Sequence, residues 1–202
     1  MNTIALRGGV ELDNALELAL EFLEAYSGLE TGDSSGPASF DESDLRLANR
    51  GGARISAAQI AAILERRGDV EQALAQLDPD ASLMDATSSI PWAPLTRLFD
   101  AFADIHGVGF SKMTKTLHKK RPALIPMLDS VVQEYLTRDL PKASSPASFG
   151  ERATALVRSY KQDLDRNRSA LQELQRELAR RGYQLTEVRI LDIVIWSVPA
   201  AT

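Results

Sequence analysis

Hydrophobic residues recur every three or four positions along most of the chain, a spacing that indicates amphipathic α-helices. In residues 10–26, for example, Leu12, Leu16, Leu20 and Leu23 lie on one face and glutamates occupy the other. The same pattern predicts helices at residues 44–50, 56–67, 69–77, 91–105, 130–138, 149–161 and 166–181. The predicted fold class is therefore all-α, a multi-helix globular domain.

Residues 186–196 form an apolar segment whose secondary structure the pattern leaves open. The run from Val188 to Trp196 is rich in isoleucine and valine, which favour strands, and periodicity alone does not separate a buried helix from a strand. No partner strand is evident elsewhere in the sequence. We therefore expect a helix here as well.

Two loop-like stretches interrupt the helical pattern. Residues 28–37 are rich in Gly and Ser, and residues 141–148 in Pro, Ser and Ala. The second stretch is the expected boundary within the chain. Residues 1–140 are predicted to form a helical region, and residues 141–202 to supply C-terminal helices that pack on the same domain.

The composition limits the cofactors and the location. With 202 residues, 44% of them hydrophobic, the chain can bury a substantial core. It has no cysteine and two histidines, which excludes thiolate and His-rich metal sites, whereas carboxylate-bound Mg²⁺ or Ca²⁺ stays open. We expect no metal site and no cofactor. Because the sequence has neither a signal pattern nor an apolar run of the ~20 residues that span a bilayer, we expect a cytoplasmic protein without membrane contact.

The charges are unevenly distributed along the chain. The formal net charge of −5 argues against a generic polyanion binder, and acidic residues dominate positions 11–44. Between Asp104 and Asp129, however, every charged side chain is basic. These cations are Lys112, Lys115, Lys119, Lys120 and Arg121. One face of the acidic protein is therefore expected to be locally positive.

The turn Gly107-Val108-Gly109 separates two predicted helices. Glycine at both ends permits positive φ angles and a close approach of the backbone to a ligand. Amides at the turn and at the start of the next helix can point at an anion, and the helix dipole favours negative charge there. We expect the phosphates of a nucleic-acid backbone to bind, without readout of base sequence, to Gly107, Val108, Gly109, Ser111, Lys112, Lys115, Lys119, Lys120 and Arg121.

A second glycine turn runs from Asn49 to Arg54 and ends the helix predicted at residues 44–50. Two interpretations of it are open. Asn49, Arg50 and Arg54 can make a secondary contact to a phosphate or a base edge. Alternatively, the segment is a capped turn between helices, and its arginines pair with the acidic N-terminal helix.

Residues 98–117, with their core Ile105-x-Gly107-Val108-Gly109, resemble the helix-hairpin-helix of DNA-repair glycosylases, placed here at about residues 92–118. The Pro-containing loop that ends in Asp129 is similar in its spacing from the hairpin. The resemblance implies DNA binding and a role for Asp129 in cleaving an N-glycosidic bond. Ser111 stands where bifunctional relatives place a Schiff-base lysine, which implies a monofunctional enzyme.

The chain also resembles a family of uncharacterised bacterial proteins. They share Lys-Arg-Pro-x-Leu-Ile-Pro, here residues 120–126, a following Asp, and a C-terminal Arg-Ile-Leu-Asp-x-x-x-Trp, here residues 189–196. This second resemblance covers most of the chain. It implies no particular activity.

Structural interpretations stand beside these functional ones. Asp129 is placed to cap the helix predicted at residues 130–138, with or without a catalytic role. The run of cations can be a solvated helix end. Asp192 is either a helix-interior partner for an arginine or a pocket residue, and both Trp92 and Trp196 are expected in the core.

The leading hypothesis is a DNA-binding protein with a glycosylase-like activity that uses Asp129. The alternative is a catalytically inactive module of the same fold that binds nucleic acid or another protein. DNA is the expected partner, through backbone contacts. Nothing in the sequence indicates an oligomeric state.

Overall fold

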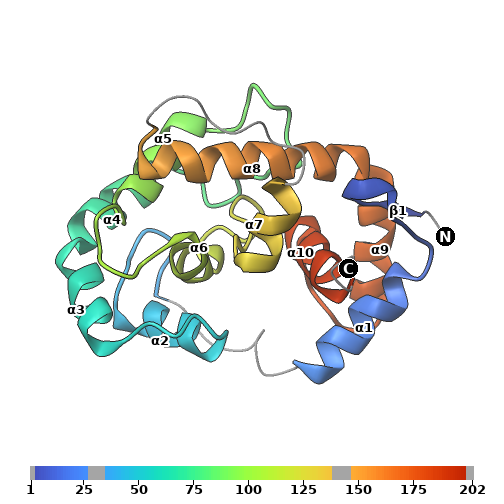
Figure 1. Ribbon diagram of the computed structural model, residues 1–202, viewed down its shortest axis with the longest axis horizontal. Helices are drawn as coiled ribbons and strands as arrows, with labels where there is room; N and C mark the ends of the chain where they lie inside the picture. Colours follow the sequence, from blue (N-terminus) through green and yellow to red (C-terminus); the bar gives the residue numbers. More distant parts are fainter. Residues whose placement is uncertain (1–2, 27–34, 138–146, 199–202) are drawn as a thin grey trace.

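The computed structural model of the chain describes residues 3–26, 35–137 and 147–198 (Figure 1). Helices dominate these residues, which confirms the all-α prediction. Most of the predicted loop at 28–37 and of the predicted boundary at 141–148 lies outside the described residues. None of the helices in the described ranges combines the length and the apolar composition that crossing a bilayer requires.

The helices follow the predicted order with shifted ends. They are α1 (Ala15–Ala25), α2 (Glu42–Arg50), α3 (Ala57–Glu65), α4 (Arg67–Leu74), α5 (Trp92–Asp100), α6 (Phe110–His118), α7 (Ser130–Thr137), α8 (Phe149–Arg166), α9 (Arg168–Arg180) and α10 (Glu187–Ser197). The apolar C-terminal segment is α10, a helix as predicted. Its residues from Val188 to Ile195 are all buried, so the apolar sequence reflects burial on every side rather than strand pairing.

The N-terminus differs from the prediction because a small antiparallel sheet precedes α1. Strand β1 (Ile4–Ala5) pairs with β2 (Glu11–Leu12). Gly8 and Gly9 turn the chain between the strands with φ angles of 75° and 74°, which glycine adopts without steric cost. The helix predicted from residue 10 begins at residue 15, since the backbone of β2 is engaged in the sheet.

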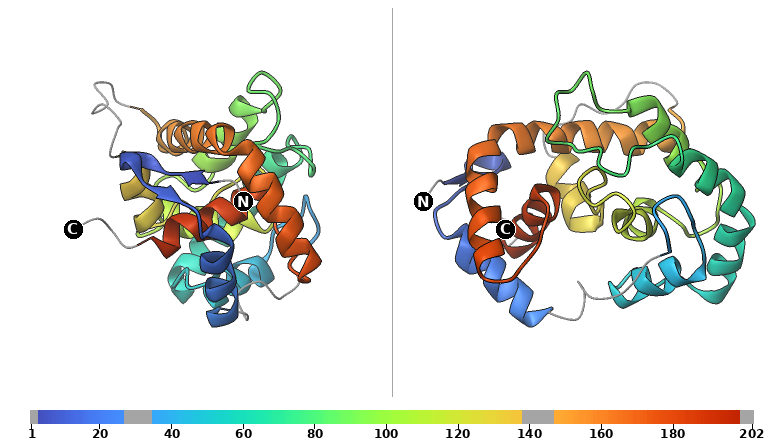
Figure 2. Two further views of the ribbon diagram at one scale, coloured as in Figure 1. Left: turned by 90° about the vertical axis from the view of Figure 1, so that its right-hand side faces the viewer. Right: turned by 180° about the vertical axis from the view of Figure 1, so that it is seen from behind.

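The helices form two groups on either side of α7 (Figures 1 and 2). Helices α2 to α6 lie on one side, and α1, α9 and α10 pack together on the other. Helix α8 runs along the edge of both groups and lies against α5. Gly150 of α8 allows this approach, because a Cβ there would lie 2.3 Å from the carbonyl oxygen of Thr96. Helices of residues 147–198 thus contact helices of the first 140 residues in both groups.

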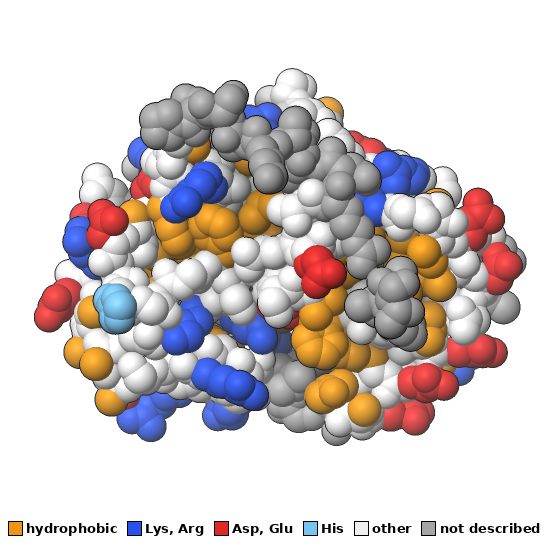
Figure 3. Space-filling view, in the orientation of Figure 1, with side chains coloured by type: hydrophobic (Ala, Val, Ile, Leu, Met, Phe, Trp, Pro, Cys, Tyr) orange, Lys and Arg blue, Asp and Glu red, His pale blue; other side chains and the backbone are white. Residues whose placement is uncertain are grey.

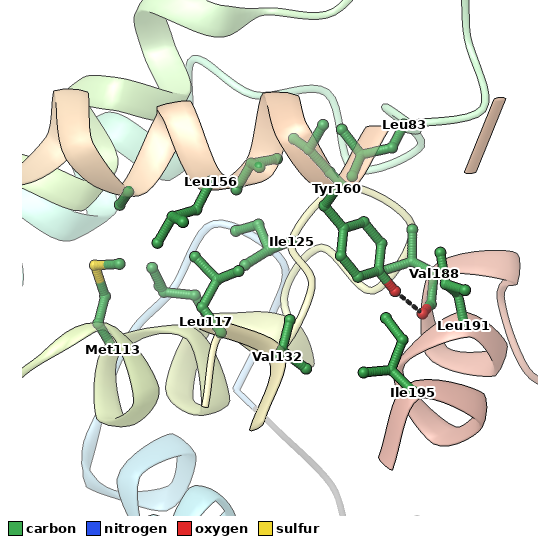
Figure 4. Close-up of a cluster of buried hydrophobic side chains, with 14 of the residues drawn as sticks. Leu83, Met113, Leu117, Ile125, Val132, Leu156, Tyr160, Val188, Leu191 and Ile195 are labelled. Carbon is green, nitrogen blue, oxygen red and sulfur yellow. Dashed lines mark hydrogen bonds between the residues drawn. The ribbon is translucent and has the colours of Figure 1, made fainter. Parts of the chain in front are cut away.

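Tyr160 of α8 lies in the core, where α6, α7 and α10 also contribute side chains (Figure 4). Its side chain is fully buried, and its hydroxyl donates to the carbonyl oxygen of Val188 at 2.7 Å. Leu117, Ile125 and Val132 are among the buried side chains of the same cluster. The segment 119–129, which contains Ile125, therefore passes through the interior instead of over the surface.

Two cations of this segment, Lys120 and Arg121, also lie inside the protein. Lys120 is 4% exposed and forms an ion pair with Asp44 of α2, with a distance of 2.7 Å between Nζ and Oδ1. Arg121 is 1% exposed. Its guanidinium donates to the carbonyl oxygens of Pro37, Leu74, Leu77 and Lys120. The structure contradicts the expectation that Lys120 and Arg121 bind phosphate, because both side chains are buried and already bonded to protein groups.

We expect Lys120→Met to lower the free energy of unfolding by about 3–5 kcal/mol, because it leaves the buried Asp44 carboxylate without its cation. Lys115→Met, the same change at a half-buried lysine of α6, is the control and should cost less than about 1 kcal/mol. Urea unfolding of the two variants measures both values. Equal losses would show that the buried ion pair is not structural.

Candidate functional site

The loop between α5 and α6 is fastened to α3. Gly107 has a φ of 72°, and a Cβ there would lie 2.4 Å from Nε2 of Gln59. The Gln59 amide donates to the carbonyl oxygen of His106 at 3.3 Å. Gly109 has a φ of −95°, so the expected positive φ is present at Gly107 and absent at Gly109. Val108 is 5% exposed, which places its side chain in the core rather than toward a ligand.

Helix α6 begins beside this loop with a positively charged first turn. Gly109 is its N-cap and has no side chain with which to cap the helix, so the first amides rely on water or a ligand. Lys112 lies in this turn and donates to Oε1 of Gln59 at 2.7 Å, and Lys115 follows on the same helix. Backbone amides, the helix dipole and the Lys112 ammonium group favour an anion at this end, whereas Lys115 lies in the last turn of α6.

The segment that leads to Asp129 is tied to both α6 and α10. On the α6 side, Oγ1 of Thr114 accepts the Leu128 amide at 2.9 Å, and Nδ1 of His118 lies 2.7 Å from the carbonyl oxygen of Ile125. On the α10 side, Oδ2 of Asp192 accepts the Met127 amide at 3.1 Å. These bonds fix the backbone before α7 and so set the position of the Asp129 side chain.

Asp129 caps α7, as one of its two interpretations predicted. Its Oδ1 accepts the amides of Val131 and Val132, both at 3.1 Å. Its Oδ2 accepts the indole N–H of Trp196 at 2.6 Å. The residue is 7% exposed, and it lines a cleft. The carboxylate is thus held in one orientation by α7 and α10 together.

The Asn49–Arg54 turn lies across the cleft from α10. The Asn49 side chain makes two hydrogen bonds with the backbone of Ile55: its Oδ1 accepts the Ile55 amide at 2.6 Å, and its Nδ2 donates to the Ile55 carbonyl oxygen at 2.9 Å. Asn49 therefore closes the turn and is not placed for a ligand. Arg50 and Arg54 are exposed and line the cleft. Neither forms an ion pair with any residue in the described ranges, so pairing with the acidic N-terminal helix is not observed there.

The cleft between the two groups of helices has a volume of about 830 Å³ (Figure 3). Of the residues predicted to bind DNA or to act in catalysis, it brings together Gly107, Gly109, Ser111, Lys112, Lys115, Arg50, Arg54 and Asp129. Val108, Asn49, Lys120 and Arg121 do not line it. Lys119 lines a separate cavity of about 40 Å³ that it shares with Lys115 and Arg189.

The opposite wall of the cleft is aromatic, which sequence patterns did not indicate. Phe22 and Tyr26 come from the C-terminal end of α1, and Trp196 comes from α10. Trp196 is 45% exposed, so the prediction that it lies in the core is wrong. Tyr26 and Trp196 are far apart in the sequence and belong to no shared motif, and only the packing of α1 on α10 brings them to one cleft.

Asp192 lines the cleft, as its pocket interpretation predicted, and the charge of Arg189 acts on it, as the arginine interpretation predicted. It is 2% exposed, and its Oδ1 has no hydrogen-bond partner in the described part of the chain. Burial raises the pKa of Asp192 to about 7. Arg189 and the hydrogen bond from the Met127 amide oppose this shift, and the nearby charge of Asp129 adds to it. Asp192 therefore titrates near neutral pH.

A family of unknown function, DUF6308, matches residues 21–198. The chain belongs to DUF6308. This confirms the sequence resemblance to a family of uncharacterised proteins, and the matched range includes every residue that lines the cleft, from Phe22 to Trp196. The sheet of β1 and β2 lies outside the DUF6308 range. No curated protein and no solved structure matches the chain, so the resemblance to DNA glycosylases stays a prediction.

The described residues contain no group of side chains arranged to bind a metal ion. In residues 3–26, 35–137 and 147–198, no three His, Asp or Glu side chains are placed to hold one ion. The two carboxylates of the cleft, Asp129 and Asp192, are each bonded to backbone amides. The described residues that line the DUF6308 cleft include cations, aromatic rings and these two carboxyl groups.

Asp192 should make stability depend on pH. Its pKa of about 7 in the folded protein exceeds the ordinary value of 3.8, so the folded state holds the proton more tightly than the unfolded chain. The resulting stabilisation is complete below pH 4 and is lost as the pH rises to about 7. Because a tenfold change in proton affinity is about 1.4 kcal/mol, the loss is on the order of 4 kcal/mol.

Asp192→Asn removes this titration and keeps an oxygen for the Met127 amide. Between pH 4 and 8 the free energy of unfolding of the wild type should therefore fall relative to that of the variant. Urea unfolding over this pH range measures the difference. Parallel curves for the two proteins would contradict the assignment.

Proposed function

We propose that this DUF6308 protein binds DNA in the cleft and acts on an unpaired nucleotide there by cleaving its N-glycosidic bond. One observation carries the proposal: a single cleft joins the first turn of α6, the Asn49–Arg54 turn and the Asp129 carboxylate. Phosphates bind at the two turns, and the sugar of the unpaired nucleotide lies beside Asp129. The resemblance of residues 98–117 and of Asp129 to DNA-repair glycosylases supports the same assignment.

The charges of the cleft suit a phosphate backbone. Lys112 and Lys115 of α6 face the same space as Arg50 and Arg54, and the amides of the first turn of α6 add partial positive charge. The chain as a whole carries a formal charge of −5. Since an acidic surface repels DNA elsewhere, this local concentration of cations directs the polyanion to the cleft.

Asp129 is suited to stabilise positive charge on a sugar. Cleavage of an N-glycosidic bond passes through an oxocarbenium-like transition state, and a carboxylate held close to it lowers the barrier. The α7 cap and the Trp196 indole hold Asp129 in place before the ligand arrives. Ser111 lies at the position of a Schiff-base lysine in bifunctional glycosylases, so in the proposed reaction the oxygen of a water molecule replaces the base on the sugar carbon, a water proton leaves with the base, and the strand is not cut.

A second candidate function is DNA binding without catalysis. One observation favours it: both carboxylate oxygens of Asp129 already accept hydrogen bonds from the protein, and the residue is 7% exposed. A capping aspartate contributes about 0.5–2 kcal/mol to stability without any catalytic role. The two candidates share the phosphate contacts and differ only in what Asp129 does.

The phosphate contacts predict a defined salt dependence. For duplex DNA, log affinity should fall linearly with log salt concentration, and both Lys115→Gln and Arg54→Gln should reduce the slope by about 0.9. Arg180→Gln is the matched control, because this exposed side chain of α9 does not line the cleft. Fluorescence anisotropy at several salt concentrations measures the slopes. If the affinity of the wild type for DNA does not depend on salt concentration, binding through phosphate contacts is excluded.

The catalytic role of Asp129 predicts that Asp129→Asn lowers base release by about 100-fold or more while the variant still binds DNA. Asparagine caps helices as well as aspartate does, so α7 should remain folded. Base release from oligonucleotides that carry damaged or modified bases is measured by chromatography. If the wild type releases no base from any of them, the enzymatic proposal fails and binding alone remains.

A further inference from the structure

Three large hydrophobic side chains are exposed within the described residues, and all lie at or beside the cleft. They are Tyr26, Val131 and Trp196, which are 46%, 36% and 45% exposed. Tyr26 and Trp196 line the cleft, and Val131 follows Ser130, which also lines it. Exposed apolar side chains that gather at one place mark an interaction site rather than ordinary surface variation.

Both exposed aromatic rings are held by partners inside the protein. Tyr26 packs on Phe22 with ring centroids 4.8 Å apart, and Arg189 supports Phe22 from a distance of 5.5 Å. The Trp196 indole is anchored at its N–H by Asp129 at 2.6 Å. Each ring is therefore fixed while part of its surface stays open to the cleft, and a ligand that stacks on it loses little side-chain entropy.

The opposite wall supplies the complementary charge. Lys112, Lys115, Arg50 and Arg54 face the aromatic wall across a cleft of about 830 Å³. Figure 3 shows Lys and Arg side chains on one side of the hollow and hydrophobic side chains on the other. A ligand that fits both walls has a flat apolar ring at one end and anionic groups at the other. The volume of the cleft lies in the range of sites that enclose a small organic group.

We propose that the cleft binds single-stranded DNA in preference to duplex DNA, with unpaired bases stacked on Trp196 and Tyr26 and the backbone along the cationic wall. This inference rests on the proposed function and specifies the form of DNA that it concerns. In a duplex the faces of each base are covered by its neighbours, so only the cations can act. A single strand engages both walls, which is the combination found in proteins that bind single strands without sequence preference.

The two tryptophans of the chain allow a direct test. Trp92 does not line the cleft; its indole donates to the carbonyl oxygen of Thr87, and Arg158 covers its ring at 4.1 Å. Trp92→Phe therefore leaves Trp196 as the single source of tryptophan fluorescence. We expect a single-stranded oligonucleotide to quench this fluorescence and a duplex of equal length to leave it unchanged. We also expect the single strand to bind at least tenfold more tightly at the same salt concentration.

Two further variants separate stacking from the hydrogen bond to Asp129. Trp196→Ala should weaken single-strand binding at least fivefold, the low end of the stacking contribution per base, and should leave duplex binding unchanged. Trp196→Phe keeps a ring without the N–H donor and should lose much less affinity. Equal losses in the two variants would show that stacking does not drive binding. The Trp92→Phe background also serves as the control, because it should bind both ligands like the wild type.

The outcomes distinguish this inference from the proposed function. If single-stranded and duplex DNA bind equally and Trp196 fluorescence does not change, the preference for single strands is overturned. The proposed phosphate contacts remain supported in that case if Lys115→Gln still lowers the salt slope. If neither ligand binds, both proposals fail. An RNA strand that binds tenfold more tightly than the matching DNA would reassign the cleft and overturn the inference. So would sedimentation showing that Trp196→Ala turns a dimer into a monomer without changing DNA affinity.

Discussion

The guanidinium of Arg121 donates to backbone carbonyls of Pro37, Leu74, Leu77 and Lys120 in the interior, at distances of 2.7–2.8 Å. These bonds satisfy the carbonyl group of Leu74, the last residue of α4, and those of three residues outside the helices, and they fix where the segment 119–129 starts. The ion pair of Lys120 with Asp44 adds a second tie to α2. Thr114, Asp192 and the α7 cap then determine where the segment ends. The position of Asp129, and hence one boundary of the cleft, follows from this chain of bonds.

The cations of residues 112–121 divide according to burial. Lys112 and Lys115 lie on the face of α6 that borders the cleft, whereas Lys120 and Arg121 follow the helix into the core. Inside the protein, Lys120 pairs with a carboxylate, and four carbonyl oxygens accept from the terminal nitrogens of Arg121, which offsets much of the cost of burying the two charges. The electrostatic field that reaches a ligand therefore comes from Lys112 and Lys115 together with Arg50 and Arg54, which belong to a distant part of the sequence.

The cleft combines groups with different physical demands. Phosphate attraction needs exposed cations, base stacking needs exposed rings, and a positioned carboxylate needs donors that hold it. Trp196 serves two of these needs, since its ring is open to the cleft and its N–H bonds Asp129. Contact with the ring and orientation of the carboxylate are thereby coupled. Asp192, buried below with a pKa of about 7, adds a group whose charge changes near neutral pH.

The sequence by itself determined the helices, the capping role of Asp129 and the hairpin turn at Gly107, because these depend on spacing and on residues close to one another in the chain. It also indicated a family of uncharacterised proteins, now DUF6308. Only the tertiary structure decided which members of the cation run are buried, that Trp196 is exposed, and that Tyr26 shares its cleft. The hydrophobic pattern also did not predict the two short strands before α1, because a strand of two residues is too short to show an alternating pattern. Burial depends on which distant helices pack together. A charged or aromatic residue therefore shows the same local sequence pattern whether its side chain is buried or exposed.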